Sequence, residues 1–92
     1  MKKCYLISYD LRAPGRNYDI LYQAIKGYRT WARITESYWA IVTTQSASEI
    51  RNYLVQFMDS NDRLFVIKSG KEAAWRNARA NSDWLKNHLN SI

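Results

Sequence analysis

Cysteine, histidine, proline and glycine are all scarce in this sequence, with one, one, one and three copies among 92 residues. A lone cysteine, Cys4, excludes an intrachain disulfide and any zinc site built from several cysteines. His88 is the only histidine, and we find no Gly-rich phosphate loop, no Ser/His/Asp set and no CxxC spacing. The sequence therefore disfavours the enzyme classes that depend on those motifs.

Long apolar runs are missing as well. No stretch approaches the roughly 20 apolar residues of a membrane span. The short apolar stretch near the N-terminus is interrupted by Asp10 and Arg12, which is not typical of a signal peptide. We therefore expect a cytoplasmic protein with no membrane segment.

Basic and aromatic residues are abundant instead. Fourteen Lys and Arg outnumber eight Asp and Glu, which leaves a formal net charge of +6. This surplus favours polyanions such as RNA or DNA, although a charge of this size also keeps small domains soluble. Four Trp, seven Tyr and two Phe are many for such a chain, and Tyr and Trp are enriched at interfaces. Because a domain this small buries a modest core, we expect it to pair with itself as a homodimer.

Two kinds of periodicity divide the first third of the chain. Residues 4–11 alternate between two faces with β-favouring side chains, which predicts a strand, and Pro14-Gly15 predicts a turn after it. Apolar residues at helical spacing predict a helix over about residues 18–28, with Asn17 as its N-cap. The apolar stripe of that helix consists of Ile20, Leu21, Ala24, Ile25 and Tyr28.

The following segments predict a hairpin, a second helix and a last strand. Residues 31–34 and 38–43 are rich in β-favouring side chains and are separated by a tight connection. Ser46 and Glu49 have the spacing of a capping box, which predicts a helix start. The apolar stripe of the second helix consists of Ile50, Tyr53, Leu54, Phe57 and Met58. Residues 64–67 are continuously apolar, which predicts a strand buried on both faces or paired with a partner.

This order of strand, helix, strand, strand, helix and strand predicts an α+β fold of the ferredoxin-like βαββαβ class. We expect a four-stranded antiparallel sheet with both helices on one face. The single domain spans residues 1–92, with a core of about residues 3–68 and a C-terminal extension of about residues 69–92.

The extension contains two tryptophans whose full exposure would be costly, so we expect it to pack on the body or to cross to a partner. Ala73-Ala74-Trp75 is compatible with a short edge strand or with a loop anchor. Ser82 has the position of an N-cap for a short helix that ends near Leu89.

Asp10 is the strongest candidate for chemistry. It follows an alternating strand and precedes a basic loop, and a carboxylate at a strand end can bind a hard divalent cation such as Mg²⁺ or Mn²⁺. One carboxylate makes a poor site, whereas two copies brought together by a dimer axis would bind the metal better. The alternative is structural, with Asp10 accepting amide hydrogens in the following turn.

Arginines flank this strand end and the predicted hairpin. They are Arg12, Arg16, Arg29 and Arg33. Guanidinium groups bind phosphate in a bidentate manner, and neighbouring aromatic rings can stack on bases. These four arginines are therefore the predicted nucleic-acid-binding residues, with solvated charges at loop ends as the alternative.

Several segments also resemble a known family. Tyr5-Leu6-Ile7-Ser8-Tyr9-Asp10-Leu11 resembles the opening strand of the small CRISPR-associated protein family Cas two. The whole chain is more similar to small bacterial proteins labelled SinR-like. The segments that carry this likeness are Tyr9-Asp10-Leu11 with Pro14-Gly15, Tyr22-x-Ala24-Ile25-Lys26, Ser37-x-Trp39, Ser46-Ala47-x-x-Ile50-Arg51, Asp59-Ser60-Asn61-Asp62-x-Leu64-x-Val66-Ile67 and Trp84-Leu85-Lys86.

The resemblance implies a ferredoxin-like fold and a homodimer. Some Cas two-like proteins are described as metal-dependent nucleases, and their strand-end aspartate corresponds to Asp10. Others hold DNA without cutting it. Between residues 31 and 39, only Ser37 and the aromatic Trp39 match the Cas two pattern.

Three functional hypotheses follow, in this order. The first is a nucleic-acid-binding homodimer without catalysis. The second is a metal-dependent endonuclease that cleaves RNA or DNA with Asp10 from both subunits. The third is a protein-interaction module, for example in a toxin–antitoxin or phage-defence pair.

Overall fold

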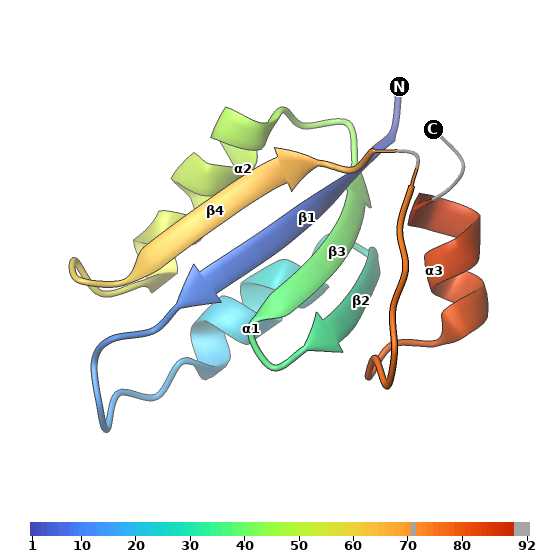
Figure 1. Cartoon of the computed structure of the whole chain (residues 1–92). Coiled ribbons are helices and arrows are strands. Elements are labelled where there is room, and N and C mark those ends of the chain that lie inside the picture. Colours follow the sequence, from blue (N-terminus) through green and yellow to red (C-terminus); the bar gives the residue numbers. More distant parts are fainter. Residues whose placement is uncertain (71, 90–92) are drawn as a thin grey trace.

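A computed structural model describes residues 1–70 and 72–89 of the chain. The elements along it are β1 (Lys3–Asp10), α1 (Asp19–Lys26), β2 (Thr30–Thr35), β3 (Tyr38–Thr43), α2 (Ala47–Leu54), a short 3-10 helix (Val55–Phe57), β4 (Arg63–Lys68) and α3 (Ser82–Leu89). The strands form one antiparallel sheet in the order β2-β3-β1-β4 (Figure 1). The predicted α+β architecture with a ferredoxin-like arrangement is confirmed, and α3 is the predicted helix of the extension.

The first core lies between the sheet and the helices α1 and α2, which cover the same face. Strand β1 lies between β3 and β4, and its alternating side chains Tyr5, Ile7 and Tyr9 point into this core. Aromatic and aliphatic side chains from both helices and from β3 complete it. The other buried members are Tyr18, Leu21, Ala24, Ile25, Trp39, Ile41, Ile50 and Leu54.

The start of α1 differs from the predicted one. The N-cap position is Tyr18, whose side chain makes no capping hydrogen bond. Asn17 lies one residue earlier, and its side-chain oxygen accepts a hydrogen bond from the backbone N–H of Asp19 at 2.8 Å. Ile20 was predicted in the buried stripe but is 66% exposed. The prediction for Ile20 is wrong because Leu21, Ala24 and Ile25 form the buried face of α1, and Ile20 lies at the border of that face.

The capping box at the start of α2 is confirmed. The backbone N–H of Ser46 donates to the Glu49 carboxylate at 2.9 Å, and the backbone N–H of Glu49 donates to the Ser46 hydroxyl at 3.2 Å. The α-helix ends at Leu54, and the predicted apolar stripe continues into the 3-10 helix and Met58. Ile50 and Leu54 are fully buried, whereas Tyr53 is 40% exposed.

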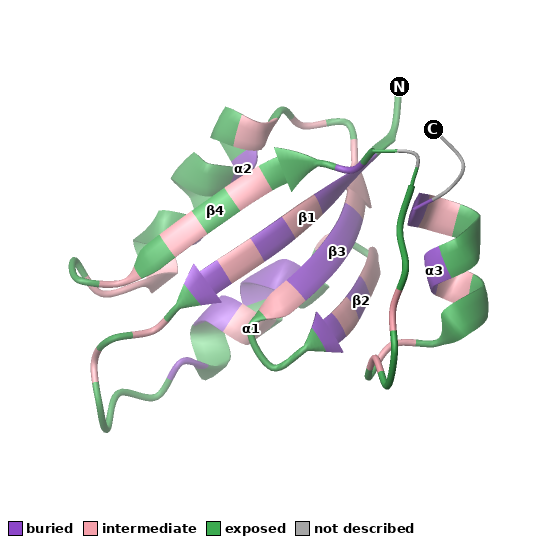
Figure 2. Cartoon of the chain, in the orientation of Figure 1, coloured by how far each residue is buried: buried purple, intermediate pink, exposed green. Residues whose placement is uncertain are grey.

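Strand β4 is an edge strand with one apolar face uncovered in the described chain. Leu64 and Val66 are half-buried against the first core, while Phe65 and Ile67 are 63% and 47% exposed. Figure 2 shows this contrast between β4 and the more buried strands β1 and β3. Of the two predicted alternatives, burial of β4 on both faces is wrong for the single chain, because no described segment covers that side of β4. The other alternative, pairing with a partner, stays a prediction.

The second core lies on the opposite face of the sheet, where the C-terminal extension covers β1, β2 and β3. Its buried members are Cys4, Ile34, Ala40, Leu85 and Leu89, and the partly buried side chains packed on them include Trp75 and Trp84. The extension is also bonded to the edge strand β2, since the backbone N–H of Arg79 donates to the carbonyl of Ile34 at 2.9 Å. The prediction that the extension packs on the body is thus confirmed for its described residues.

Details of the extension differ from the prediction. Ala73-Ala74-Trp75 forms no strand in the described chain, and Trp75 acts as an anchor on the second core. The helix α3 is capped by Asn81, whose side chain accepts the backbone N–H of Trp84 at 3.1 Å, instead of by Ser82. Residues 71 and 90–92 of the predicted extension lie outside the described residues. No helix among the described residues is long and apolar enough to cross a membrane.

If α3 contributes to stability by covering the sheet, Leu85→Ala should be costly. Leu85 is fully buried in the second core, and truncating such a leucine costs about 2–5 kcal/mol of unfolding free energy. Its exposed neighbour Lys86 provides the control, and Lys86→Ala should change stability by less than about 0.5 kcal/mol. Chemical denaturation measures both. Equal stability of Leu85→Ala and wild type would contradict this packing.

Candidate functional site

Asp10 lies at the end of β1 between two arginines. Its carboxylate is 3.3 Å from a guanidinium nitrogen of Arg12 and 3.5 Å from one of Arg63, which pairs with Asp10 across the sheet. The Asp10 side chain is 54% exposed. The alternative structural role for Asp10 was to accept a hydrogen bond from a backbone N–H of the following turn. The backbone N–H of Arg12 in that turn donates to the carboxylate of Asp62 instead.

The surroundings of Asp10 bear on the predicted Mg²⁺ or Mn²⁺ site. Such ions need several oxygen ligands, yet residues 1–70 and 72–89 contain no group of three or more His, Cys, Asp or Glu side chains placed to hold a metal ion. The groups nearest to the Asp10 carboxylate are cations. One chain alone therefore does not fit a divalent ion at Asp10, and a metal site or catalytic centre shared by two copies of Asp10 stays a prediction.

The four predicted nucleic-acid-binding arginines occupy different places. Arg12 pairs with Asp10, and Arg16 pairs with Asp59 at 3.4 Å. Arg33 lies on β2, near the hairpin that follows it. Arg29 is at the other end of the sheet, where it lines a hollow together with Thr43. Thr43 pairs with Lys3, the first residue of β1. The arginines thus do not form one cluster with Asp10.

Asp62 organises the loop after β1, a role that the sequence analysis missed. Its carboxylate accepts the backbone N–H of Arg12 at 2.6 Å, the backbone N–H of Asp59 at 2.7 Å and the hydroxyl of Tyr18 at 2.9 Å. Burial is the largest single effect and raises the pKa of Asp62, but these hydrogen bonds and the charge of Arg16 together lower the pKa below its ordinary value of 3.8. The loop that carries Arg12 and Arg16 is thereby tied to the segment before β4.

A second and richer site lies along the free edge of β2. We call it the β2-edge groove, a hollow of about 340 Å³. One of its walls comes from α1, β2 and β3, and the other comes from the extension. Its charged and aromatic lining consists of Lys26, Trp31, Arg33, Trp39, Arg79 and Trp84. No acidic side chain of the described chain lines it.

Arg33 is held in the groove by aromatic rings and by a carbonyl. Its guanidinium carbon lies 4.8 Å from the ring centre of Trp39 and 4.9 Å from that of Tyr22. It also donates two hydrogen bonds to the carbonyl of Glu36, at 2.8 and 3.2 Å. The side chain is 22% exposed. Arg33 therefore provides a positive charge in a fixed position, stabilised by cation–π contacts.

The other two cations are more accessible. The amine of Lys26 lies 5.4 Å from the ring centre of Trp31, and Lys26 is exposed on α1. Arg79 is 49% exposed and pairs with Glu36 at 2.8 Å. Glu36 also lies 3.9 Å from Arg33, so one carboxylate is shared between two guanidinium groups and the region keeps a net positive charge.

The signal for this groove was partly present in the sequence. Trp31 and Arg33 are two residues apart on a strand, so their side chains share a face, and Arg33 pairs with Trp39 across the hairpin. The contributions of Arg79 and Trp84 depend on how the extension folds over β2, which no local pattern indicates.

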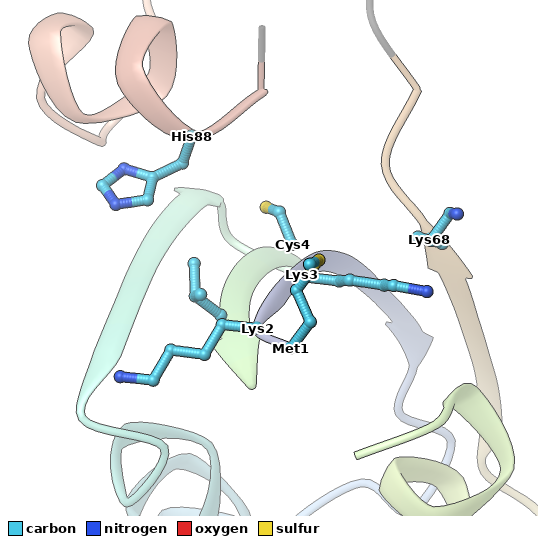
Figure 3. A pocket seen from close by; sticks show the side chains of 7 residues that line it. Met1, Lys2, Lys3, Cys4, Lys68 and His88 are labelled. Atoms are coloured by element: carbon cyan, nitrogen blue, oxygen red, sulfur yellow. The ribbon is translucent and has the colours of Figure 1, made fainter. Parts of the chain in front are cut away.

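A third hollow, of about 210 Å³, lies where β1 begins. It is lined by Met1, Lys2, Lys3, Cys4, Val42, Lys68 and His88, which come from the N-terminus, β1, β3, β4 and α3 (Figure 3). Burial raises the pKa of the Cys4 thiol to about 11, so this cysteine is a core residue and not a nucleophile.

His88 does not offer a free base there. Its Nδ1 lies 2.8 Å from the carbonyl of Trp84, and its ring stacks on the Trp84 ring with centres 4.1 Å apart. These contacts give His88 a structural role, and the lysines of this hollow add positive charge without a catalytic group.

The chain matches no known protein-family model, and no solved structure is significantly similar to it.

The role of Asp62 is testable through its pH dependence. In Asp62→Asn, one acceptor oxygen becomes a donor that faces an existing N–H or O–H, so we expect a loss of roughly 1–2 kcal/mol of unfolding free energy near pH 7. Because the folded-state pKa of the wild-type carboxyl is lowered, its stabilisation is present above about pH 4 and is lost as the pH falls through the folded-state value. The difference between the two proteins should therefore shrink in acid.

Asp19→Asn is the matched control, because Asp19 is an exposed carboxylate in the first turn of α1. It should cost only a few tenths of a kcal/mol. Denaturant unfolding at several pH values checks both variants, and a pH-independent difference for Asp62→Asn would contradict the proposed role of its charge.

Proposed function

We propose that this protein binds nucleic acid as a homodimer, without catalysis. The observation that carries the proposal is the β2-edge groove, where three cations and three indole rings converge. No acidic side chain of the described chain lines the hollow, and the nearby Glu36 offsets only one of the three positive charges. Cationic side chains neutralise phosphates, and indole rings contact bases. A groove built only for packing would not concentrate Lys26, Arg33 and Arg79 around aromatic rings.

The positive surface continues from the groove to the end of β1. The hairpin and the end of β1 are adjacent, since the backbone N–H of Tyr9 donates to the carbonyl of Ser37 at 3.1 Å. Arg12 and Arg63 share the carboxylate of Asp10. In the same way, Arg33 and Arg79 share the carboxylate of Glu36. Each group keeps one positive charge in excess, which supports contact with a phosphate backbone longer than the groove itself.

We propose that two copies of the chain pair through the uncovered apolar face of β4. Phe65 and Ile67 lie opposite Ser8 and Leu6 of β1, on the face that the extension covers elsewhere. Exposed apolar side chains on an edge strand favour pairing with another chain.

Binding should show the electrostatic signature of phosphate contacts. Three cation–phosphate contacts predict a loss of affinity of roughly 20-fold for a single strand between about 50 and 200 mM salt. Arg79→Gln should weaken binding. It should also make the slope of log affinity against log salt concentration shallower, by the amount expected for the loss of about one phosphate contact. Fluorescence anisotropy with labelled RNA and DNA, single-stranded and duplex, measures this.

Arg76→Gln provides the charge-matched control, because Arg76 is exposed in the same segment but does not line the groove. Its effect should be clearly smaller than that of Arg79→Gln. Absence of binding to every nucleic acid at low salt would overturn the proposal and favour the protein-interaction hypothesis.

The oligomeric state is testable separately. We expect the wild-type protein to sediment as a dimer and Phe65→Glu to sediment as a monomer, because a buried charge at the proposed contact is costly. Ile20→Glu is the matched control, since Ile20 is equally exposed on α1, away from β4. Sedimentation velocity distinguishes the outcomes, and a monomeric wild type, or the same effect from both variants, would contradict a contact at β4.

A further inference from the structure

The aromatic rings of the β2-edge groove differ in accessibility. Trp39 is fully buried, and its ring lies 5.6 Å from that of Trp31, centre to centre. Trp31 and Trp84 are only half-buried. Trp31 belongs to β2, on the side of the sheet that α1 covers, and Trp84 belongs to α3 on the other side. The groove therefore offers an accessible indole in each wall, with a buried indole and a fixed guanidinium between them.

An indole can contact the face of a base only if that face is free. In a duplex, both faces of each base are stacked on neighbouring base pairs, whereas the bases of a single strand can turn outward and stack on aromatic side chains. The volume of about 340 Å³ lies near the lower end of the range for small-molecule pockets. It suits one nucleotide and is too small for several.

The cations of the groove differ in how accessible they are to a phosphate. Lys26 and Arg79 are exposed and belong to opposite walls of the groove, and the ion pair of Arg79 is with the exposed carboxylate of Glu36. Arg33 is mostly covered and is already bonded to the carbonyl of Glu36. A strand that crosses the free edge of β2 would therefore meet one accessible cation on each side of the inserted base.

We propose that the β2-edge groove takes one unpaired base of a single-stranded nucleic acid, between Trp31 and Trp84, with the adjoining phosphates on Lys26 and Arg79. This inference rests on the proposed nucleic-acid binding and adds the class of ligand. It distinguishes single strands from duplexes, which charge alone would not do.

Three probes of equal length and similar labelling test it. They are a short single-stranded oligonucleotide, the same sugar-phosphate strand without bases, and the corresponding duplex. The abasic strand keeps the phosphates and lacks the bases. Because stacking of one base on an aromatic side chain accounts for roughly a fivefold to hundredfold change in affinity, we expect the single strand to bind the wild-type protein at least about fivefold more tightly than the abasic strand.

Tryptophan variants assign that preference to the groove. Trp84→Leu should remove most of the difference between the single strand and the abasic strand, and Trp84→Phe should restore part of it. Trp75→Leu is the matched control, because Trp75 is a half-buried tryptophan of the same extension that does not line the groove. Circular dichroism shows whether each variant is folded. If Trp84→Leu does not fold, the three probes on the wild-type protein still decide.

The outcomes separate the two proposals. Equal affinity of the wild-type protein for the single strand, the abasic strand and the duplex would overturn this inference and leave nucleic-acid binding intact. Failure of all three probes to bind would overturn the proposed function itself. A base-dependent preference that Trp75→Leu removes and Trp84→Leu keeps would place the contact elsewhere and would also overturn the inference.

Discussion

The buried indole of Trp39 joins the core of this protein to its candidate binding surface. It is fully buried, and its N–H donates to the hydroxyl of Tyr9 at 2.9 Å. That hydroxyl lies 3.1 Å from the carbonyl of Glu36, to which it donates. The same carbonyl accepts two hydrogen bonds from Arg33. A single chain of polar contacts therefore connects the central strand, the hairpin and the floor of the groove, so the position of Arg33 depends on correct packing of the core.

The second constraint is that the sheet has two apolar faces. The helices α1 and α2 cover one face, and the C-terminal extension covers part of the other. This division has two consequences. The extension forms a wall of the groove because its Arg79 is bonded to the edge strand β2, and Phe65 and Ile67 of β4 stay exposed because the described part of the extension packs on β1, β2 and β3 instead. Packing of the core thus creates both proposed interaction surfaces, the groove at one edge and the apolar strip at the other.

The sequence predicted local features well. The alternation in β1 and the capping box of α2 depend on residues close together in the chain, so they were recognised directly. Asn81 and Ser82 both have suitable side chains for an N-cap, and only the structure distinguishes them. Ile20 lies next to Leu21 at the border of an apolar stripe, where sequence spacing alone does not decide which residue is buried.

The candidate site was less predictable because its parts come from distant segments. Arg63 reaches Asp10 from the opposite strand, and Arg79 reaches Glu36 from the extension. Of the four arginines chosen from the sequence, only Arg33 lies in the groove. Composition indicated correctly that cations and aromatic rings are abundant, but their convergence depends on the path of the extension over β2, which periodicity does not specify.

Indole resonances in a ¹H–¹⁵N spectrum test the central claim most directly, because each of the four tryptophans contributes one side-chain N–H signal. On titration with a short single-stranded oligonucleotide, the signals of Trp31 and Trp84 should shift, and the signal of Trp75 should stay in place because Trp75 lies outside the groove. Unchanged signals from Trp31 and Trp84 at saturating ligand, or a larger shift of Trp75, would contradict the assignment of nucleic-acid binding to the β2-edge groove.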